Sequence, residues 1–130
     1  MKRTRLRKKG KQKISLLQRK LWDECKRIIR ARYPRICYTC GGATGEGAGC
    51  HTSHLWPKAS LGAWLKYDLR LLRLCCYNCN INLGGNGAVF YAKMLKENGQ
   101  KYMNNLSKER QISVKAYEHY EKLLAEYKKL

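Results

Sequence analysis

Two pairs of cysteines, each pair separated by two residues, constrain this chain more than any other feature of its sequence. The pairs are Cys37/Cys40 and Cys76/Cys79, and the segment between them is rich in Gly and poor in long apolar runs. A segment of that composition buries little apolar surface, so it needs a staple to fold. Four thiolates on two tight turns are the tetrahedral donor set that zinc prefers. The spacing therefore predicts a structural Zn²⁺ bound by Cys37, Cys40, Cys76 and Cys79.

Other roles for the cysteines remain open at this point. A thioredoxin-type redox site needs one such pair beside a strand–helix unit, and a disulfide framework is disfavoured because the chain has seven cysteines, an odd number. Cys75 could replace Cys76 as a ligand through a wider loop, although the two-residue spacing favours Cys76. Cys50 is left over and is interpreted as structural. Cys25 falls on the apolar stripe of a predicted helix and is interpreted as a small core residue.

The chain is strongly basic. Its 130 residues include 28 Lys and Arg against 9 Asp and Glu, which gives a formal net charge of +19. Such an excess predicts a polyanionic partner, with nucleic acid ahead of an anionic membrane surface. No run of residues approaches the roughly 18 apolar residues of a membrane span, and the charged first residues are unlike a secretory signal. We therefore expect an intracellular protein of a reducing compartment.

Hydrophobic periodicity divides the chain into four parts. Residues 1–13 are almost entirely basic and polar, and we expect a disordered arm that contacts nucleic acid. A helix with one apolar and one cationic side is predicted over 14–34. A zinc-bound core over 35–98 and a helical extension over 99–130 follow. The basic side chains of the arm that we expect to contact DNA are Arg3, Arg5, Arg7, Lys8 and Lys9.

The core is predicted to mix short strands with helices. The Gly-rich stretch between the first cysteine pair and Cys50 is interpreted as a hairpin loop, with 50–56 as the strand that returns to 35–38. Residues 57–74 are interpreted as a loop with at most one short helix. Amphipathic helices are expected over 87–97 and from residue 113 onward. The predicted fold class is α+β.

A second group of polar residues accompanies the cysteine pairs. His51 and His54, two of the three histidines, lie between the pairs, and Asn80 directly follows Cys79. Taken alone, the histidines fit zinc ligation or phosphate contact as well as catalysis. Because four cysteines satisfy the zinc, the histidines are free for proton transfer or for a second divalent ion. Asn80 would be fixed by the adjacent Cys79–zinc bond, with its amide oxygen aimed at the same ion.

Four basic residues lie between the histidine pair and the second cysteine pair. They place positive charge near a scissile phosphate, although a solvated loop would have the same composition. No device for reading base edges is visible in the sequence, which favours recognition of backbone or shape. These predicted DNA contacts are Lys58, Lys66, Arg70 and Arg73.

The order of these motifs resembles a known family. Cys-x-x-Cys, His-x-x-His, Cys-x-x-Cys-Asn and then Gly-Gly-Asn before an amphipathic helix are similar to the NinG (Rap) recombination nucleases of lambdoid phages. With an acidic residue at the first histidine, the order resembles phage endonuclease VII. Both belong to the HNH, or ββα-metal finger, nucleases, and the resemblance covers roughly residues 35–106. The chain departs from the HNH pattern at Leu71, where an Asn commonly orients the base, and from NinG at Ser53, where Gly is usual.

The resemblance implies a metal-dependent DNA endonuclease that leaves 5′-phosphate and 3′-hydroxyl ends. His54 would be the general base, and His51 and Asn80 would bind a catalytic Mg²⁺ or another divalent ion such as Mn²⁺. The implied substrate is branched or recombination-intermediate DNA, such as a Holliday junction or D-loop. The location would be the cytoplasm of the host cell if the protein is phage-encoded. A homodimer formed through the C-terminal helix would allow symmetric cleavage of a junction.

Two rival functions remain open. A non-catalytic zinc-finger protein that binds nucleic acid, for example a regulator, needs the cysteine pairs and the charge, but it does not need His51, His54 and Asn80 together. An RNA-binding zinc ribbon has the same requirements.

Overall fold

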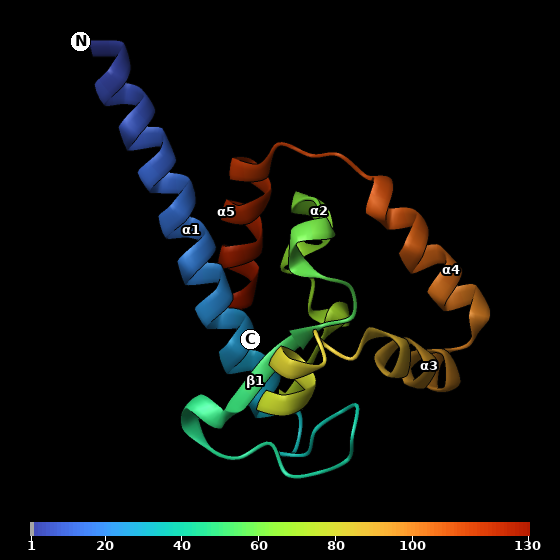
Figure 1. The fold of residues 1–130 in the computed structure, drawn as a ribbon. Helices are drawn as coiled ribbons and strands as arrows, with labels where there is room; N and C mark the ends of the chain where they lie inside the picture. The colour runs from blue at the N-terminus through green and yellow to red at the C-terminus, as the bar shows by residue number, and fades with distance from the viewer. Residues whose placement is uncertain (1) are drawn as a thin grey trace.

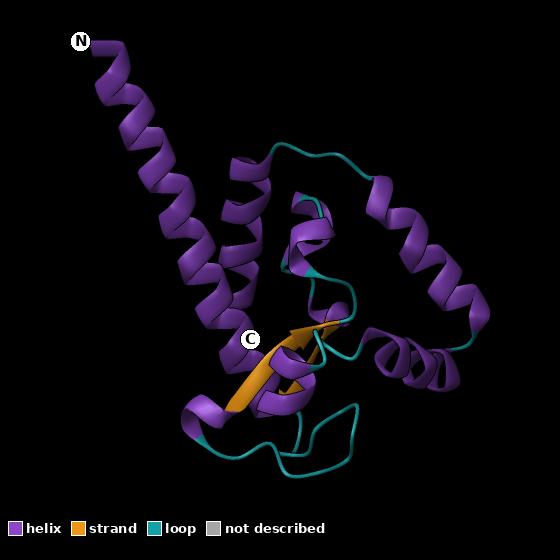
Figure 2. Ribbon diagram, in the orientation of Figure 1, coloured by secondary structure: helices purple, strands orange, loops and turns teal. Residues whose placement is uncertain are grey.

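The computed structural model describes the backbone of residues 2–130 and the side chains of residues 13–130. Helices pack on both faces of a two-stranded antiparallel sheet (Figures 1 and 2), so the predicted α+β class is confirmed. In the described part of the chain, no helix is both long enough and apolar enough to cross a membrane. The helices are α1 (Lys2–Arg32), α2 (Ala63–Lys66), α3 (Gly87–Asn98), α4 (Gln100–Lys108) and α5 (Ala116–Tyr127), and the strands are β1 (Cys50–His54) and β2 (Leu72–Cys76).

The long helix α1 contains most of the helix predicted over 14–34. It ends at Arg32, shortly before Pro34, because a proline disfavours helical backbone in the residue before it. The bounds of α1 also take in residues 2–13, where the sequence predicts a disordered arm. The side chains of residues 1–12 lie outside the described residues, and so do the DNA contacts predicted for Arg3, Arg5, Arg7, Lys8 and Lys9.

The predicted hairpin between 35–38 and 50–56 is wrong. Ile36 forms an isolated bridge with Ala43, and the N–H of Cys37 donates to the carbonyl of Gly42 at 2.7 Å. The first cysteine turn therefore closes on itself and leaves no strand for β1 to pair with. Its backbone meets the sheet only where the N–H of Tyr38 donates to the carbonyl of Leu74 at 2.9 Å.

β1 pairs instead with β2, which lies at the end of the stretch predicted to be a loop. The register places Cys50 opposite Cys76 and His54 opposite Leu72. Between the two strands, the chain forms short 3₁₀ turns and the single-turn helix α2. The strand pair thus brings the segment with the histidines directly against the segment that ends in the second cysteine pair.

The two faces of the sheet bury separate apolar cores, because side chains alternate between faces along a strand. Leu72 and Leu74 face α1 and α5, whereas Cys75 faces the first cysteine turn, α3 and α4. In the first core, the hydroxyl of Tyr127 donates to the carbonyl of Tyr67 at 2.8 Å. The first core also buries Leu21, Cys25, Ile28, Ile29, Cys50, Tyr120 and Leu124, and the second buries Cys37, Leu55, Leu61, Leu65, Leu71, Cys79, Phe90, Met94, Met103 and Leu106.

Helices α3 and α5 agree with the sequence patterns that predicted them. α3 runs from Gly87 to Asn98 and stops at Gly99, whose φ of +88° favours glycine. α5 starts slightly later than expected and packs its apolar stripe against α1. His119 on α5 stacks on Trp64 with ring centroids 5.0 Å apart, so this histidine has a packing role.

The second core depends on Phe90. Its side chain is fully buried and lies 5.0 Å from the ring of Tyr38, between α3 and the cysteine turn. We expect Phe90→Ala to lower the free energy of unfolding by about 3–5 kcal/mol in urea denaturation, because it opens a cavity in a packed core. The neighbouring Val89 is 43% exposed. Val89→Ala is the matched control and should change stability by less than about 0.5 kcal/mol; equal effects of the two changes would contradict this core.

Candidate metal and nucleic-acid site

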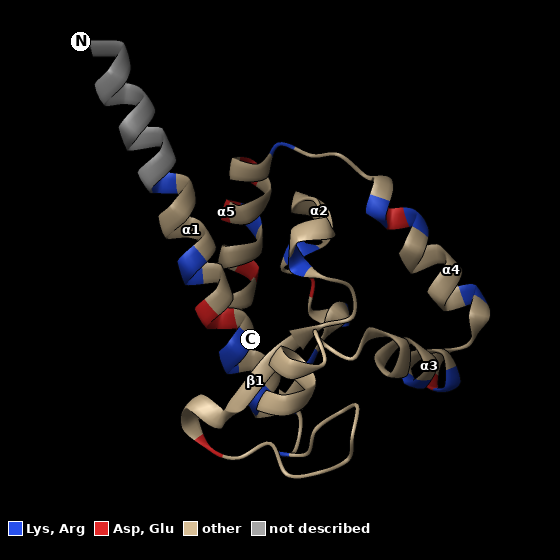
Figure 3. Cartoon of the chain, in the orientation of Figure 1, with Lys and Arg blue, Asp and Glu red and all other residues tan. Residues whose placement is uncertain are grey.

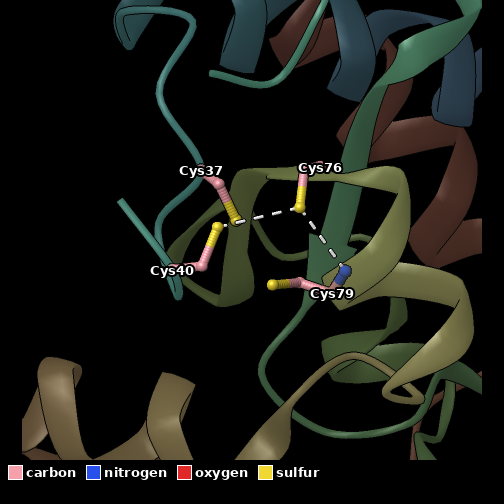
Figure 4. A group of neighbouring side chains, drawn as sticks. All are labelled: Cys37, Cys40, Cys76 and Cys79. Atoms are coloured by element: carbon pink, nitrogen blue, oxygen red, sulfur yellow. Dashed lines mark hydrogen bonds between the residues drawn. The ribbon is translucent and has the colours of Figure 1, made fainter. Parts of the chain in front are cut away.

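The four cysteines predicted to bind zinc come together in the structure (Figure 4). Cys37 and Cys40 lie on the first turn, Cys76 ends β2, and Cys79 lies in η4 (Asn78–Asn82), a single π-helical turn. The four sulfurs lie within 4.8 Å of one another, and Cys40 Sγ is 3.8 Å from Cys76 Sγ. Sulfurs bound tetrahedrally at about 2.3 Å from one zinc ion are about 3.8 Å apart. The cluster therefore has the size and the donors to hold a metal ion such as Zn²⁺.

Backbone and side-chain N–H groups support this cluster. The N–H of Gly42 donates to Cys40 Sγ at 3.4 Å, and the N–H of Cys79 donates to Cys76 Sγ at 3.5 Å. Asn86 stands at the N-cap position of α3, but its side-chain amide donates to Cys79 Sγ at 3.9 Å and does not cap the helix. Donors of this kind stabilise thiolate charge and orient metal ligands.

The remaining cysteines lie outside the cluster. Cys75 is fully buried on the opposite side of the strand from Cys76, and burial raises the pKa of its thiol to about 12. Burial likewise raises the pKa of Cys25 to about 12, and its thiol donates to the carbonyl of Tyr67 at 3.6 Å. Cys50 is buried in the first core. These three act as small core residues, and the structure places Cys76 in the cluster.

His51 and Asn80 are in direct contact. The amide of Asn80 donates to His51 Nδ1 at 2.9 Å, and the ring of Tyr77 lies edge-on to His51 with centroids 5.5 Å apart. Two adjacent ligands of an octahedral ion at about 2.1 Å are about 3 Å apart, so this spacing fits a shared ion once the amide presents its oxygen. At a site of this kind, an imidazole nitrogen would favour softer ions than Mg²⁺, such as Mn²⁺.

His54 does not share a face of the sheet with His51, because the two residues are three apart on one strand. Its ring stacks on Trp22 of α1, with centroids 5.3 Å apart and an interplanar angle of 11°. His54 Nε2 donates to the carbonyl of Lys66 at 2.9 Å, and this bond requires the hydrogen of a neutral ring to sit on Nε2. The other ring nitrogen, Nδ1, makes no hydrogen bond within the described part of the chain. It is also absent from the fully buried polar atoms that lack a partner. Nδ1 can therefore accept a proton.

Burial shifts the titration of His54. Removal from solvent lowers its pKa below the ordinary value of 6.5, and the nearby Lys58 and Lys66 lower it further. The Lys66 carbonyl acts in the other direction, with a smaller effect than burial. The imidazole is therefore neutral at pH 7, which is the form that can take a proton.

His54 and Asn80 line one cavity of about 320 Å³. The loop after η4 approaches β1 closely there, since a side chain at Gly85 would lie 3.8 Å from the hydroxyl of Ser53. Gly84 and Gly85 both have positive φ, which glycine adopts without strain. The cavity is completed by Ser53, Leu55, Trp56, Pro57, Lys58 and Gly87. The structure thus joins His51 to Asn80 by contact and His54 to Asn80 by a shared cavity.

The four predicted DNA contacts have different surroundings. Lys58 lines the cavity, 4.6 Å from the ring centroid of Trp22. Lys66 is half-buried next to His54. Arg73 lies away from the cavity, over the rings of Tyr33 and Tyr38 at 5.1 and 5.3 Å.

Arg70, the fourth predicted DNA contact, lies in a hydrogen-bond network with two carboxylates. Its guanidinium donates two hydrogen bonds to Asp68 (3.0 and 2.7 Å) and two to Glu109 (2.8 and 2.9 Å), and these bonds hold the pKa of Glu109 below its usual value. The network links the turn before β2 to the end of α4. The guanidinium of Arg70 therefore directs four of its hydrogen bonds to carboxylates of the protein and not to a phosphate.

Sequence reasoning missed two residues that shape the cavity. Trp22 forms the stacking wall behind His54, and Arg110 lies 4.5 Å from the ring centroid of Trp56, a cavity residue. Both lie outside the predicted core of 35–98, and only the fold brings them to it. For Trp22, the signal in the sequence was an aromatic residue beside the apolar stripe of a predicted helix. Such residues are too common to indicate a functional site by themselves.

Comparisons with protein families, with curated proteins and with solved structures found no match to this chain.

Adjacent cysteines provide a sharp test of the cluster. We expect Cys76→Ala to abolish stoichiometric zinc binding, because three thiolates remain and the second pair is broken, whereas Cys75→Ala should retain one zinc ion per chain. Zinc content would be measured by mass spectrometry of metals in protein purified under reducing conditions. Zinc retained by Cys76→Ala and lost by Cys75→Ala would reverse the assignment.

Proposed function

We propose that this protein is a metal-dependent DNA endonuclease of the ββα-metal finger type. The observation that carries the proposal is the environment of His54. One ring nitrogen of this neutral imidazole is held by a backbone carbonyl, the other is free, and the ring borders a basic cavity that Asn80 shares. A ring fixed in one tautomer with an available lone pair meets the requirements of a general base.

In the proposed reaction, His54 Nδ1 takes a proton from water as the water oxygen attacks the scissile phosphorus. The Nε2–H bond to the carbonyl of Lys66 keeps the ring oriented and stabilises the imidazolium that forms. Trp22 covers one face of the ring, so the ring cannot turn away from the cavity. The P–O bond to the 3′ oxygen breaks, and this oxygen takes a proton from solvent, so that the products are 5′-phosphate and 3′-hydroxyl ends. His54 Nδ1 then releases its proton to solvent.

His51 and Asn80 would hold the divalent ion, which when bound would supply positive charge near the leaving oxygen. Cys37, Cys40, Cys76 and Cys79 would hold a structural Zn²⁺. Because Asn80 follows a zinc ligand directly, the zinc cluster would fix the position of the amide. Because an imidazole and an amide carry no negative charge to offset that of a bound ion, such an ion would keep its full charge to attract a phosphate, and its affinity should rise when DNA is bound.

Charge favours DNA as the substrate. Between Gly47 and Lys96, Asp68 is the sole acidic residue, and Arg70 already pairs with it. In Figure 3, the ribbon of β1 and η4 carries none of the red that marks Asp and Glu. A phosphate that approaches the cavity meets Lys58, and the cavity lining contains no Asp or Glu. A branched or recombination-intermediate substrate is part of the proposal through the resemblance to NinG and endonuclease VII, as is a homodimer.

Cleavage assays separate the nuclease from a non-catalytic zinc finger. We expect the wild-type protein to cut plasmid or four-way junction DNA with Mn²⁺ or Mg²⁺, and His54→Ala to cut at least about 10²-fold more slowly while binding DNA and zinc normally. Since the pKa of His54 lies below 6.5, the wild-type rate should stay level at neutral pH and fall only below pH 6.5.

Several outcomes would contradict the proposal. DNA binding without cleavage under every divalent ion would favour the non-catalytic finger. Undiminished cleavage by His54→Ala would place the base elsewhere. Preferential displacement of DNA by RNA would favour an RNA-binding zinc ribbon.

Lys58 provides a test of the phosphate contact. Lys58→Ala should weaken binding to all DNA sequences alike and reduce the slope of log affinity against log salt by about 1, because one phosphate contact is lost. Fluorescence anisotropy at several salt concentrations measures both quantities. Lys122→Ala, an exposed change on α5, is the control; an equal effect there would point to net charge and not to a contact in the cavity.

A further inference from the structure

Three large apolar side chains are exposed around η4, next to the candidate site. Tyr77 is 55% exposed, Ile81 is 51% exposed and Leu83 is 53% exposed. None of them belongs to either core. Exposed apolar residues that gather in one short segment mark an interaction surface more often than scattered ones do.

This apolar patch (Tyr77, Ile81 and Leu83) stands on a rigid support. The N–H of Leu83 donates to the carbonyl of Asn78 at 2.9 Å, and the N–H of Gly85 donates to the carbonyl of Cys79 at 2.9 Å. Cys79 itself belongs to the sulfur cluster. The segment is the yellow turn beside β1 in Figure 1. A backbone held by these bonds loses little conformational freedom when the patch binds a partner.

The patch also adjoins the proposed catalytic residues. Tyr77 packs edge-on against His51, and Ile81 follows Asn80 directly in the chain. Whatever contacts the patch is therefore held at the proposed site of cleavage. The side chains of Ile81 and Leu83 have no part in the proton transfer or in ion binding, so they can be changed independently.

The charge around the patch favours nucleic acid as its occupant. The segment from Leu69 to Lys96 contains basic residues and no acidic one. Asn78 and Asn82 add a polar pair within the turn, joined by a hydrogen bond of 3.0 Å. A polyanion drawn to this surface presents apolar area only through the faces of its bases. These faces are covered in an unbroken duplex and become accessible where stacking is interrupted.

We propose that Tyr77, Ile81 and Leu83 form a wedge that contacts unstacked bases at a branch point and so selects branched DNA over linear duplex. This inference rests on the proposed function, because it explains which DNA is brought to His54. Insertion of apolar side chains between base steps costs unstacking energy. That cost is smallest where the helix is already interrupted, and so the wedge favours junctions.

The test compares the double variant Ile81→Ser/Leu83→Ser with Val89→Ser, which changes an exposed apolar residue on α3. Affinity for a four-way junction and for a linear duplex of equal length would be measured by anisotropy without added divalent ion, so that no cleavage occurs. A 2-aminopurine at the branch point reports unstacking. We expect the double variant to bind the junction about tenfold more weakly and to change duplex affinity less than about twofold. The increase in 2-aminopurine fluorescence that the wild-type protein causes at the branch point should be absent.

Several results would overturn the wedge. One is a wild-type protein that binds junction and duplex equally well. Another is a double variant that keeps the junction preference of the wild type, and a third is a double variant that loses affinity for junction and duplex to the same extent. Zinc content and thermal unfolding would verify that the double variant is folded, and Ile81→Ser alone would replace it if it is not. Loss of binding to phosphatidylserine vesicles, with junction binding intact, would instead assign the patch to a membrane surface.

The binding assay also separates this inference from the nuclease proposal. A protein that loses junction preference in the double variant, yet cuts no DNA with any ion, would retain the wedge and refute the nuclease. A protein that cuts DNA while the double variant keeps full junction preference would retain the nuclease and refute the wedge.

Discussion

The mutual approach of four cysteine sulfurs is the interaction on which the rest of the core depends. It joins the closed turn at Cys37 to the end of β2 and to the π-helical turn η4 that directly follows it in the chain. Thiolates this close repel one another unless a cation lies between them. The same bonds determine where Asn80 and the apolar patch lie, so the fold and the candidate chemistry share one support.

The alternation of side chains along β1 gives the site its layout. His51 faces the second core, where Asn80 and Tyr77 contact it, and His54 faces α1. One strand thus presents the proposed ion-binding residue to one side and the proposed base to the other, and Asn80, which contacts His51, shares a cavity with His54. If His54 is the base, its distance from His51 and Asn80 would let it take a proton without binding the ion itself.

Local patterns in the sequence predicted the sulfur cluster and the helices α3 and α5. The contacts between segments far apart in the chain were not predicted. The two-residue spacing located the sulfur cluster, and the periodicities of α3 and α5 are long enough to be distinctive. β2 was missed because Leu-Arg-Leu-Leu-Arg-Leu over 69–74 fits a helix or a loop as well as a strand. The pairing of β1, the stack of Trp22 on His54 and the bonds from Arg70 to Glu109 all join segments far apart in the chain. No local pattern encodes such partners.

The position of Trp22 limits how far the cysteine-rich core can act alone. A fragment cut at 35–98 would keep all four sulfurs, both histidines of β1 and Asn80, yet it would lose the aromatic wall that covers one face of His54. It would also expose Leu72 and Leu74, which α1 and α5 cover. Exchange of this core between proteins, in evolution or in engineering, would therefore have to carry α1 with it. The transferable unit is larger than the motif that identifies it.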